Sequence, residues 1–138
     1  MKLFVFILLL PFFMACSSQK SDKKTRKDDI YSAQIIFEDS IYDFGSLILR
    51  DKPYSHTFHL KNTGDVPAVI LHVNPSCRCT SVNYNKTPIT IGGKDSIQVY
   101  FDSKESAIGY FDKVIKVRIN SPRTYTLRVK GYVNKVQQ

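Results

Sequence analysis

The sequence predicts an all-β fold, a single antiparallel β-sandwich of about seven or eight strands. Apolar and polar residues alternate from Ala33 onward, and no stretch sustains a helical period. Gly, Pro, Asn and Asp interrupt this alternation at short intervals, as turns between strands do. The segment 33–134 is long enough to bury one core, so we expect one domain there, followed by a tail at 135–138.

The clearest strands are those in which every second side chain is apolar. Phe58 and Leu60 fall on one face of the stretch 54–61 together with His56, which we therefore expect to be a satisfied core residue. The same pattern and its turn signals define the remaining strands. They are expected at 34–38, 66–73, 78–83, 87–91, 97–102, 111–119 and 125–133.

Turn signals between these stretches favour a sandwich of immunoglobulin-like type, and a closed barrel is the alternative on the same signals. The chain has no Trp and no widely spaced Cys pair, which excludes the antibody form of the fold. The turn signals are Phe44-Gly45, Asn62-Thr63-Gly64-Asp65, Asn74-Pro75, Gly92-Gly93, Gly109 and Asn120-Ser121-Pro122. The inner faces are predicted to hold Phe37, Phe44, Phe58, Leu60, Val69, Leu71, Ile97, Val99, Phe101, Ile115, Val117, Leu127 and Val129.

Residues 1–15 have the layout of a signal peptide. One Lys precedes an apolar run, Leu3–Phe13, that is shorter than the roughly 20 residues a membrane-spanning helix needs. The segment Phe13-Met14-Ala15-Cys16 resembles the lipobox of bacterial lipoproteins, which implies that Cys16 is lipidated and becomes the mature N-terminus. Cleavage after Ser17 is the alternative, because Ala15-Cys16-Ser17 fits the pattern of the ordinary signal peptidase.

Residues 16–32 are predicted to form a flexible basic tether between the lipid and the domain. The part 17–29 holds five Lys or Arg against three Asp and no aliphatic or aromatic residue, so it buries too little to order itself. Five minus three gives it +2 of the net charge of +8, and its basic residues can also lie on anionic head groups. We expect no nucleic-acid partner for an exported chain. The expected location is the bacterial cell envelope, with the lipid in the inner or outer membrane and the domain facing the periplasm.

Several short motifs follow one another along the domain. They are Tyr42-Asp43-Phe44-Gly45, Phe58-His59-Leu60-Lys61-Asn62-Thr63-Gly64, Ser76-Cys77-Arg78-Cys79-Thr80, Pro88-Ile89, Gly92-Gly93-Lys94, Phe101-Asp102, Gly109-Tyr110-Phe111, Ile119-Asn120-Ser121 and Val129-Lys130-Gly131-Tyr132-Val133. In this order they resemble the bacterial domain of unknown function 1573 family over about residues 34–134. The resemblance implies an exported, often lipidated immunoglobulin-like domain related to ASH and major-sperm-protein domains, and it implies no activity. The family typically has Gly where Arg78 stands, so this chain is expected to need neither a positive φ nor a close backbone approach there.

The Cys77-Arg78-Cys79 motif is the candidate site for thiol chemistry. In an extended strand the two Cα atoms would lie roughly 6.6 Å apart with both thiols on one face. A disulfide also needs Cβ atoms about 3.8 Å apart, so this bond requires a local bend, which Pro75 favours, and it is expected to be easily reduced. An exported compartment lets disulfides persist, and the charge of Arg78 near a sulfur would favour the thiolate.

Metal binding and plain packing are the alternatives for the same pair. Two thiolates can hold copper(I), whereas zinc would need two further ligands, of which His72 is the nearest in sequence. The spacing is tighter than in common structural zinc sites, and no second cluster follows it. In the plain interpretation one cysteine packs in the core and the other lines a strand end. All three interpretations stay open on the sequence.

The sequence contains no arrangement typical of an enzyme. Paired carboxylates, a nucleophile elbow and a phosphate-binding glycine loop are all missing. We therefore expect a non-catalytic binding or structural module for protein partners, with thiol-redox or copper/zinc handling as the alternative. A partner would dock on a sheet face or add a strand to an exposed edge. The outward aromatic residues expected to serve such contacts are Tyr84, Tyr100, Tyr110 and Tyr132.

Overall fold

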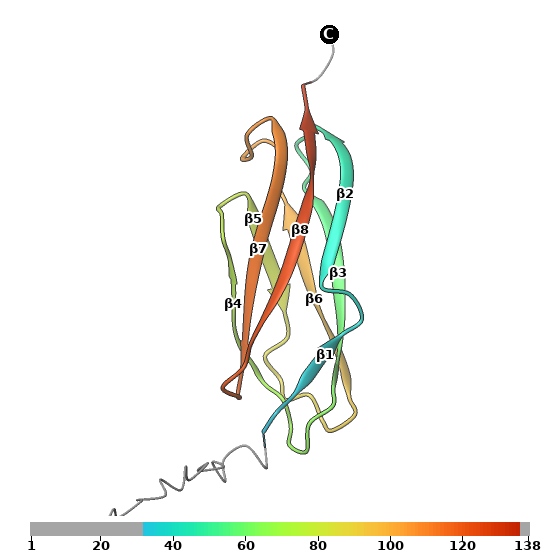
Figure 1. Cartoon of the computed structure of the whole chain (residues 1–138), viewed down its shortest axis with the longest axis vertical. Helices are drawn as coiled ribbons and strands as arrows, with labels where there is room; N and C mark the ends of the chain where they lie inside the picture. The colour runs from blue at the N-terminus through green and yellow to red at the C-terminus, as the bar shows by residue number, and fades with distance from the viewer. Residues whose placement is uncertain (1–31, 136–138) are drawn as a thin grey trace, which may run out of the picture.

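The computed structural model describes residues 32–135, which fold as a sandwich of two β-sheets without a helix in that range (Figure 1). This confirms the predicted all-β fold. The strands are β1 (Ile35–Phe37), β2 (Ile41–Ile48), β3 (Tyr54–Asn62), β4 (Ile70–Pro75), β5 (Thr80–Tyr84), β6 (Lys94–Phe101), β7 (Gly109–Ile119) and β8 (Thr124–Asn134). The predicted signal peptide, Cys16, nearly all of the tether and the end of the tail lie outside the described residues. Within 32–135 no helix is long and apolar enough to cross a membrane.

Each sheet has four strands. Sheet A has the order β1-β3-β6-β5, and sheet B has the order β2-β8-β7-β4. All neighbouring strands are antiparallel except β2 and β8, which pair in parallel. This one parallel pair arises because β1 lies in sheet A and the chain then crosses at residues 38–40 to place β2 in sheet B. The antiparallel prediction therefore holds for every pair but this one.

The sequence predicts no strand at the position of β2, because Phe44-Gly45 is a turn signal. Gly45 has a φ of 67° and accommodates a shift of pairing register between Asp43 and Ser46, so the strand continues past it as a bulge. The Gly45 amide donates to Asp43 Oδ1 at 2.8 Å. A Cβ on Gly131 of β8 would lie 2.8 Å from the Gly45 carbonyl oxygen and 2.9 Å from the Phe111 ring. Any side chain at position 131 would therefore prevent β2 and β8 from lying as close together as they do.

The predicted strands 66–73 and 87–91 also differ from the structure. Strand β4 begins at Ile70, and a register shift before His72 brings Ile70 and Val73 to the inner face, so Leu71 is 41% exposed instead of buried. A bulge of this kind breaks the period of two on which the prediction relied. The stretch 87–91 forms no strand and pairs only through an isolated bridge from Ile89 to Ala68.

The core has two parts. The main cluster fills most of the space between the sheets, and Phe37 and Phe44 pack half-buried against it. A smaller group, the Cys79 cluster, consists of Leu47, Cys79, Phe101, Phe111 and Val133. The predicted core residues that are fully buried are Phe58, Leu60, Ile97, Val99, Phe101, Ile115, Val117, Leu127 and Val129.

The buried polar side chain of Asn62 explains the Asn62-Thr63-Gly64 motif. Its Nδ2 donates to the carbonyl oxygens of Val66 at 2.9 Å and Ile89 at 3.0 Å, and its Oδ1 accepts from Gly64 N at 3.0 Å. A Cβ on Gly64 would lie 2.5 Å from Gln34 N, so only glycine fits there. This motif therefore organises the loop after β3 and has a structural role.

Candidate functional site

Cys77 and Cys79 lie in a turn that carries the chain from β4 of sheet B to β5 of sheet A. The predicted strand 78–83 begins only at Thr80, whose amide donates to the Cys77 carbonyl oxygen at 3.3 Å. The two cysteines form a disulfide, and their Cα atoms are 5.3 Å apart. This is shorter than the roughly 6.6 Å expected for an extended strand, so the bend that the bond requires is present.

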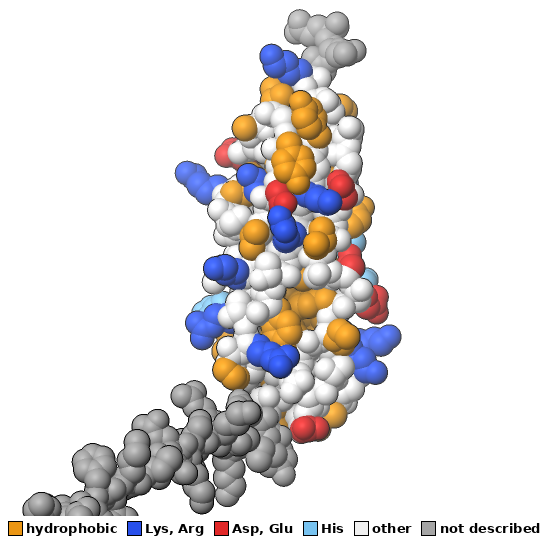
Figure 2. Space-filling view, viewed as in Figure 1, with side chains coloured by type: hydrophobic (Ala, Val, Ile, Leu, Met, Phe, Trp, Pro, Cys, Tyr) orange, Lys and Arg blue, Asp and Glu red, His pale blue; other side chains and the backbone are white. Residues whose placement is uncertain are grey.

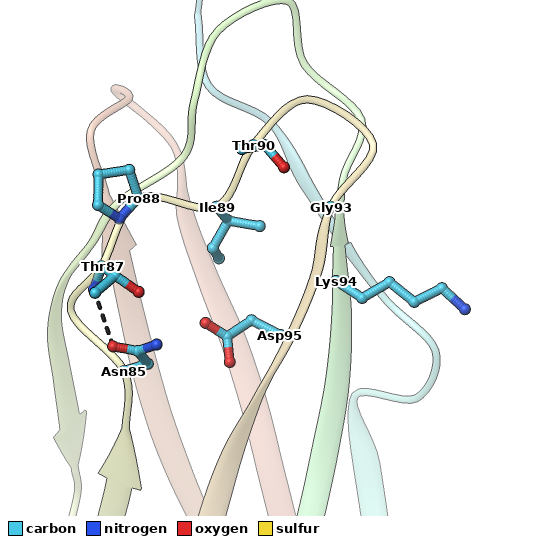
Figure 3. Close-up of a pocket in the computed structure, with 8 residues that line it drawn as sticks. All are labelled: Asn85, Thr87, Pro88, Ile89, Thr90, Gly93, Lys94 and Asp95. Atoms are coloured by element: carbon cyan, nitrogen blue, oxygen red, sulfur yellow. Dashed lines mark hydrogen bonds between the residues drawn. The ribbon is translucent and has the colours of Figure 1, made fainter.

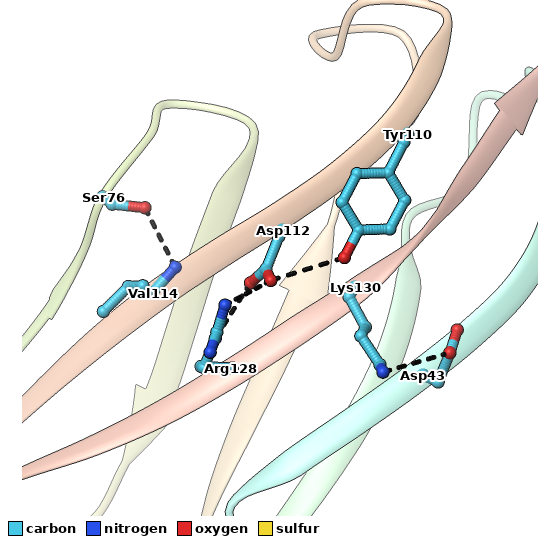
Figure 4. Close-up of polar contacts among 7 residues, drawn as sticks. All are labelled: Asp43, Ser76, Tyr110, Asp112, Val114, Arg128 and Lys130. Carbon is cyan, nitrogen blue, oxygen red and sulfur yellow. Dashed lines mark hydrogen bonds and ion pairs between the residues drawn. The ribbon is translucent and has the colours of Figure 1, made fainter.

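The turn is fixed to both sheets by hydrogen bonds to their backbones. Ser76 N donates to the Val114 carbonyl oxygen of β7 at 2.8 Å, and Val114 N donates to Ser76 Oγ at 3.1 Å (Figure 4). On the other side, Asp102 N donates to the Cys79 carbonyl oxygen at 2.8 Å. These contacts are independent of the sulfur–sulfur bond.

The two sulfurs have different surroundings. Cys79 is 4% exposed and belongs to the Cys79 cluster, in which the rings of Phe101 and Phe111 stack with centroids 3.9 Å apart. Cys77 is half-buried and packs on the outside of this cluster. Thr80 Oγ1 lies 3.3 Å from Cys77 Sγ and 4.0 Å from Cys79 Sγ.

Arg78, between the two cysteines, is exposed. Among residues 32–135 only glycines have positive φ, so Arg78 occupies its position without the backbone conformation that glycine favours. This agrees with the expectation that the chain does not need glycine's positive φ at this position.

In the described residues, His72 does not join the cysteine pair to form a metal-binding group. His72 is exposed on β4, where it pairs with Arg118 of β7, while Cys79 is buried between the sheets. No group of three or more His, Cys, Asp or Glu residues in the described part of the chain is arranged to hold a metal ion. His56 is satisfied as predicted: its Nε2 lies 2.9 Å from Asp39 Oδ2, and its ring stacks on Tyr42 with centroids 3.6 Å apart.

The outer face of sheet B carries two exposed tyrosines. Tyr110 of β7 and Tyr132 of β8 are directly paired across the strands, and they are 67% and 48% exposed. Ile48 at the end of β2 and Ile108 just before β7 are also exposed at this end of the domain. We call these four residues the aromatic patch. Figure 2 shows apolar side chains gathered on the upper part of this face.

Ion pairs lie next to the aromatic patch. Arg128 donates through Nε to Asp112 Oδ1 at 3.0 Å and through Nη2 to Oδ2, and Lys130 Nζ lies 3.7 Å from Asp43 Oδ2 (Figure 4). The Tyr110 hydroxyl donates to Asp112 Oδ2 at 3.4 Å. The hydrogen bond to the Asp112 carboxylate raises the pKa of the Arg128 guanidinium above its ordinary value. The tyrosines and the charges therefore form one continuous surface.

Basic side chains continue along the same face away from the aromatic patch. Lys116 and Arg118 of β7 are exposed, and neither forms an ion pair with another residue in the range 32–135. The acidic residues nearest the patch, Asp112 and Asp43, are already paired with Arg128 and Lys130. The face thus carries an excess of positive charge.

The other two predicted outward tyrosines differ from Tyr110 and Tyr132. Tyr84 packs against the main core, because its position on β5 opposite Ile97 turns it inward. Tyr100 is half-buried on sheet A, and its hydroxyl donates to Gln98 Oε1 at 2.6 Å. The sequence analysis did not identify Asp112, Lys116, Arg118 and Arg128, although all four lie in predicted strands at outward positions.

A shallow hollow of about 240 Å³ lies beside the start of β6 (Figure 3). The Asp95 carboxylate points into it, and Thr87 N donates to Asn85 Oδ1 at 3.0 Å on its wall. The Lys94 side chain points away. This single carboxylate lies among amide and hydroxyl groups and is not paired with a nucleophile or a second acid.

The two-sheet topology defines an immunoglobulin-like β-sandwich domain. The model of the family described as "Protein of unknown function (DUF1573)" matches residues 35–133, and the chain belongs to this family. A comparison with curated proteins found no match.

Solved structures share this fold at low sequence identity. A protein of unknown function from Porphyromonas gingivalis W83 is 17% identical with a TM-score of 0.64, and the match covers 75% of this chain and 48% of that one. The ASH/PapD-like domain 7 of human CEP192 is 10% identical with a TM-score of 0.62, and the match covers 77% and 89%. The VesB protease of Vibrio cholerae is 13% identical with a TM-score of 0.54, and the match covers 76% and 33%. At these identities the likeness concerns the fold alone.

Proposed function

We propose that the protein is a non-catalytic, lipid-anchored lipoprotein of the bacterial cell envelope that binds an acidic protein partner through the outer face of sheet B. The family and the fold support a binding module. The anchor is supported by the lipobox resemblance at Cys16 and by the basic stretch that follows it. A flexible random-coil tether of roughly 16 residues would span on the order of 20 Å, so the domain could contact partners at that distance from the membrane.

The exposed pair Tyr110 and Tyr132 is the observation that carries this proposal. Tyrosine is enriched in the residues that dominate binding energy, because its large ring packs well and its hydroxyl finds a polar partner. Both side chains stand next to charged residues that can form a polar rim around an apolar contact. A protein surface can cover both tyrosines and the charged groups beside them in one contact, so a face of this composition suits a protein partner.

The charge of the face supports an acidic partner. Lys116 and Arg118 remain without ion-pair partners on the described part of the chain, while Asp43 and Asp112 are neutralised. Complementary charge raises the association rate and guides orientation, and salt screens this effect. Binding is therefore expected to weaken as ionic strength rises.

Co-purification from envelope membranes tests the proposal. The double variant Tyr110→Ala/Tyr132→Ala should lose the partner, and Lys116→Gln/Arg118→Gln should bind it more weakly and with a smaller dependence on salt. Tyr100→Ala is the matched control, because it removes a tyrosine from the outer face of the other sheet. Equal recovery of the partner with all three variants would refute the assignment of this face.

A further inference from the structure

We propose that the Cys77–Cys79 disulfide is a site of thiol–disulfide exchange that accepts two electrons from a dithiol protein in the same compartment. The proposal does not rest on the binding face of sheet B. It rests on the position of the bond in a turn between the sheets and on the different surroundings of its two sulfurs.

The unequal burial of the two cysteine residues determines which one is attacked. Cys77 is half-buried at the edge of the Cys79 cluster, whereas Cys79 is 4% exposed and packed with Phe101 and Phe111. An incoming thiolate can therefore reach Cys77 Sγ, and Cys79 becomes the leaving group. Arg78 is exposed between them and attracts an anionic nucleophile to this spot.

Thr80 can stabilise the leaving sulfur. Its side-chain oxygen is within 4.0 Å of Cys79 Sγ and 3.3 Å of Cys77 Sγ, and the residue is 5% exposed. A hydroxyl that donates to a thiolate lowers the cost of its charge, which matters most where surrounding aromatic rings exclude water. Thr80 thus acts as a positioning residue for the step in which Cys79 gains charge.

The exchange is balanced in two steps. One thiolate of the dithiol attacks Cys77 Sγ, forms a mixed disulfide, and releases Cys79 as a thiolate that takes a proton from water. The second thiol of the dithiol protein loses its proton and attacks the first sulfur of that same protein in the mixed disulfide. This step releases Cys77 as a thiolate, which is protonated in turn. The dithiol is oxidised to a disulfide, and Cys77 and Cys79 are both reduced to thiols.

The turn can open without unfolding of the domain. Ser76 remains bonded to Val114, and the Cys79 carbonyl oxygen remains bonded to Asp102 N, when the sulfurs separate. The disulfide joins residues only two positions apart, so it does not connect distant parts of the chain. Reduction is therefore expected to change the turn locally.

The test is reduction of the native full-length chain in detergent by dithiothreitol, with alkylation and mass spectrometry of the peptide that contains both cysteines. We expect both thiols to appear without denaturant, and much faster than the domain unfolds. Reduction only in denaturant, or only at the rate of unfolding, would overturn the proposal.

Single-cysteine variants test the predicted order of attack. With Cys79→Ala, the remaining Cys77 should form a mixed disulfide with oxidised glutathione at least about tenfold faster than Cys79 does in Cys77→Ala. Thr80→Val should slow the reduction of the native disulfide about fivefold, and Thr80→Ser should restore it. Equal reactivity of the two cysteines, or no effect of Thr80→Val, would contradict the mechanism.

Discussion

Reduction of the Cys77–Cys79 bond is expected to weaken the domain only slightly. The bond closes a loop of three residues, since the cysteines are two positions apart. In the chain-entropy description such a loop contributes about 1.6 kcal/mol at room temperature, because the stabilisation grows with the logarithm of loop length. Small domains have unfolding free energies of about 5–15 kcal/mol, so the reduced protein should remain folded.

Urea unfolding of the oxidised and the phosphine-reduced protein, followed by circular dichroism, measures this difference. Reduction changes only the one bond, so it serves better than a cysteine substitution, which would also remove a sulfur from the Cys79 cluster. The midpoint should fall by roughly 1 M urea with an unchanged slope. A loss above about 4 kcal/mol, or unfolding on reduction alone, would show that the disulfide is a structural crosslink, and the reasoning would be refuted.

Three further predictions concern other parts of the molecule. Asn62→Ala should lower the free energy of unfolding by about 3 kcal/mol, because it leaves buried backbone groups without partners, while exposed Asn83→Ala should change it by less than about 0.5 kcal/mol in the same urea assay. The hydrogen bond from Lys104 and the positive charge of Lys104 lower the pKa of Asp51. The ion pair therefore stabilises the fold fully at pH values above the ordinary carboxyl pKa, and this stabilisation is lost as the pH falls through the lowered pKa of Asp51. In carboxylate NMR titrations, Lys104→Gln should return the pKa of Asp51 to its ordinary range, and an unchanged titration would contradict the pairing. Cys16→Ser should abolish incorporation of labelled palmitate, and retained label would exclude lipidation at that residue.

Regular alternation made part of the fold predictable. Strands β3, β6 and β8 keep a strict period of two, so their inward residues, such as Phe58, Val99 and Leu127, were identified correctly. Strands β2 and β4 contain register shifts, at Gly45 and near Leu71. A bulge changes which residues face inward without changing composition, so period alone could not reveal it.

The candidate site was predictable only as a set of residues. The need for a bend at Cys77 and Cys79 followed from the geometry of a disulfide, but the extended strand assumed there proved to be a turn. Tyr110 and Tyr132 were expected to point outward, yet their pairing depends on the register between β7 and β8. Because β7 and β8 form a hairpin, their register is fixed by the turn at 120–123, and the turn signal Asn120-Ser121-Pro122 locates this turn without defining its geometry.

The central claim is that the outer face of sheet B binds a protein partner. Photocrosslinking in living cells tests this claim most directly. Benzoylphenylalanine in place of Tyr132 should yield one specific crosslinked product with an acidic envelope protein, and the product should diminish when Lys116→Gln/Arg118→Gln is added. The same photoreactive residue in place of Tyr100 is the matched control on sheet A and should yield no such product. Crosslinking from position 100 but not from position 132 would contradict the account and would place the binding surface on the opposite sheet.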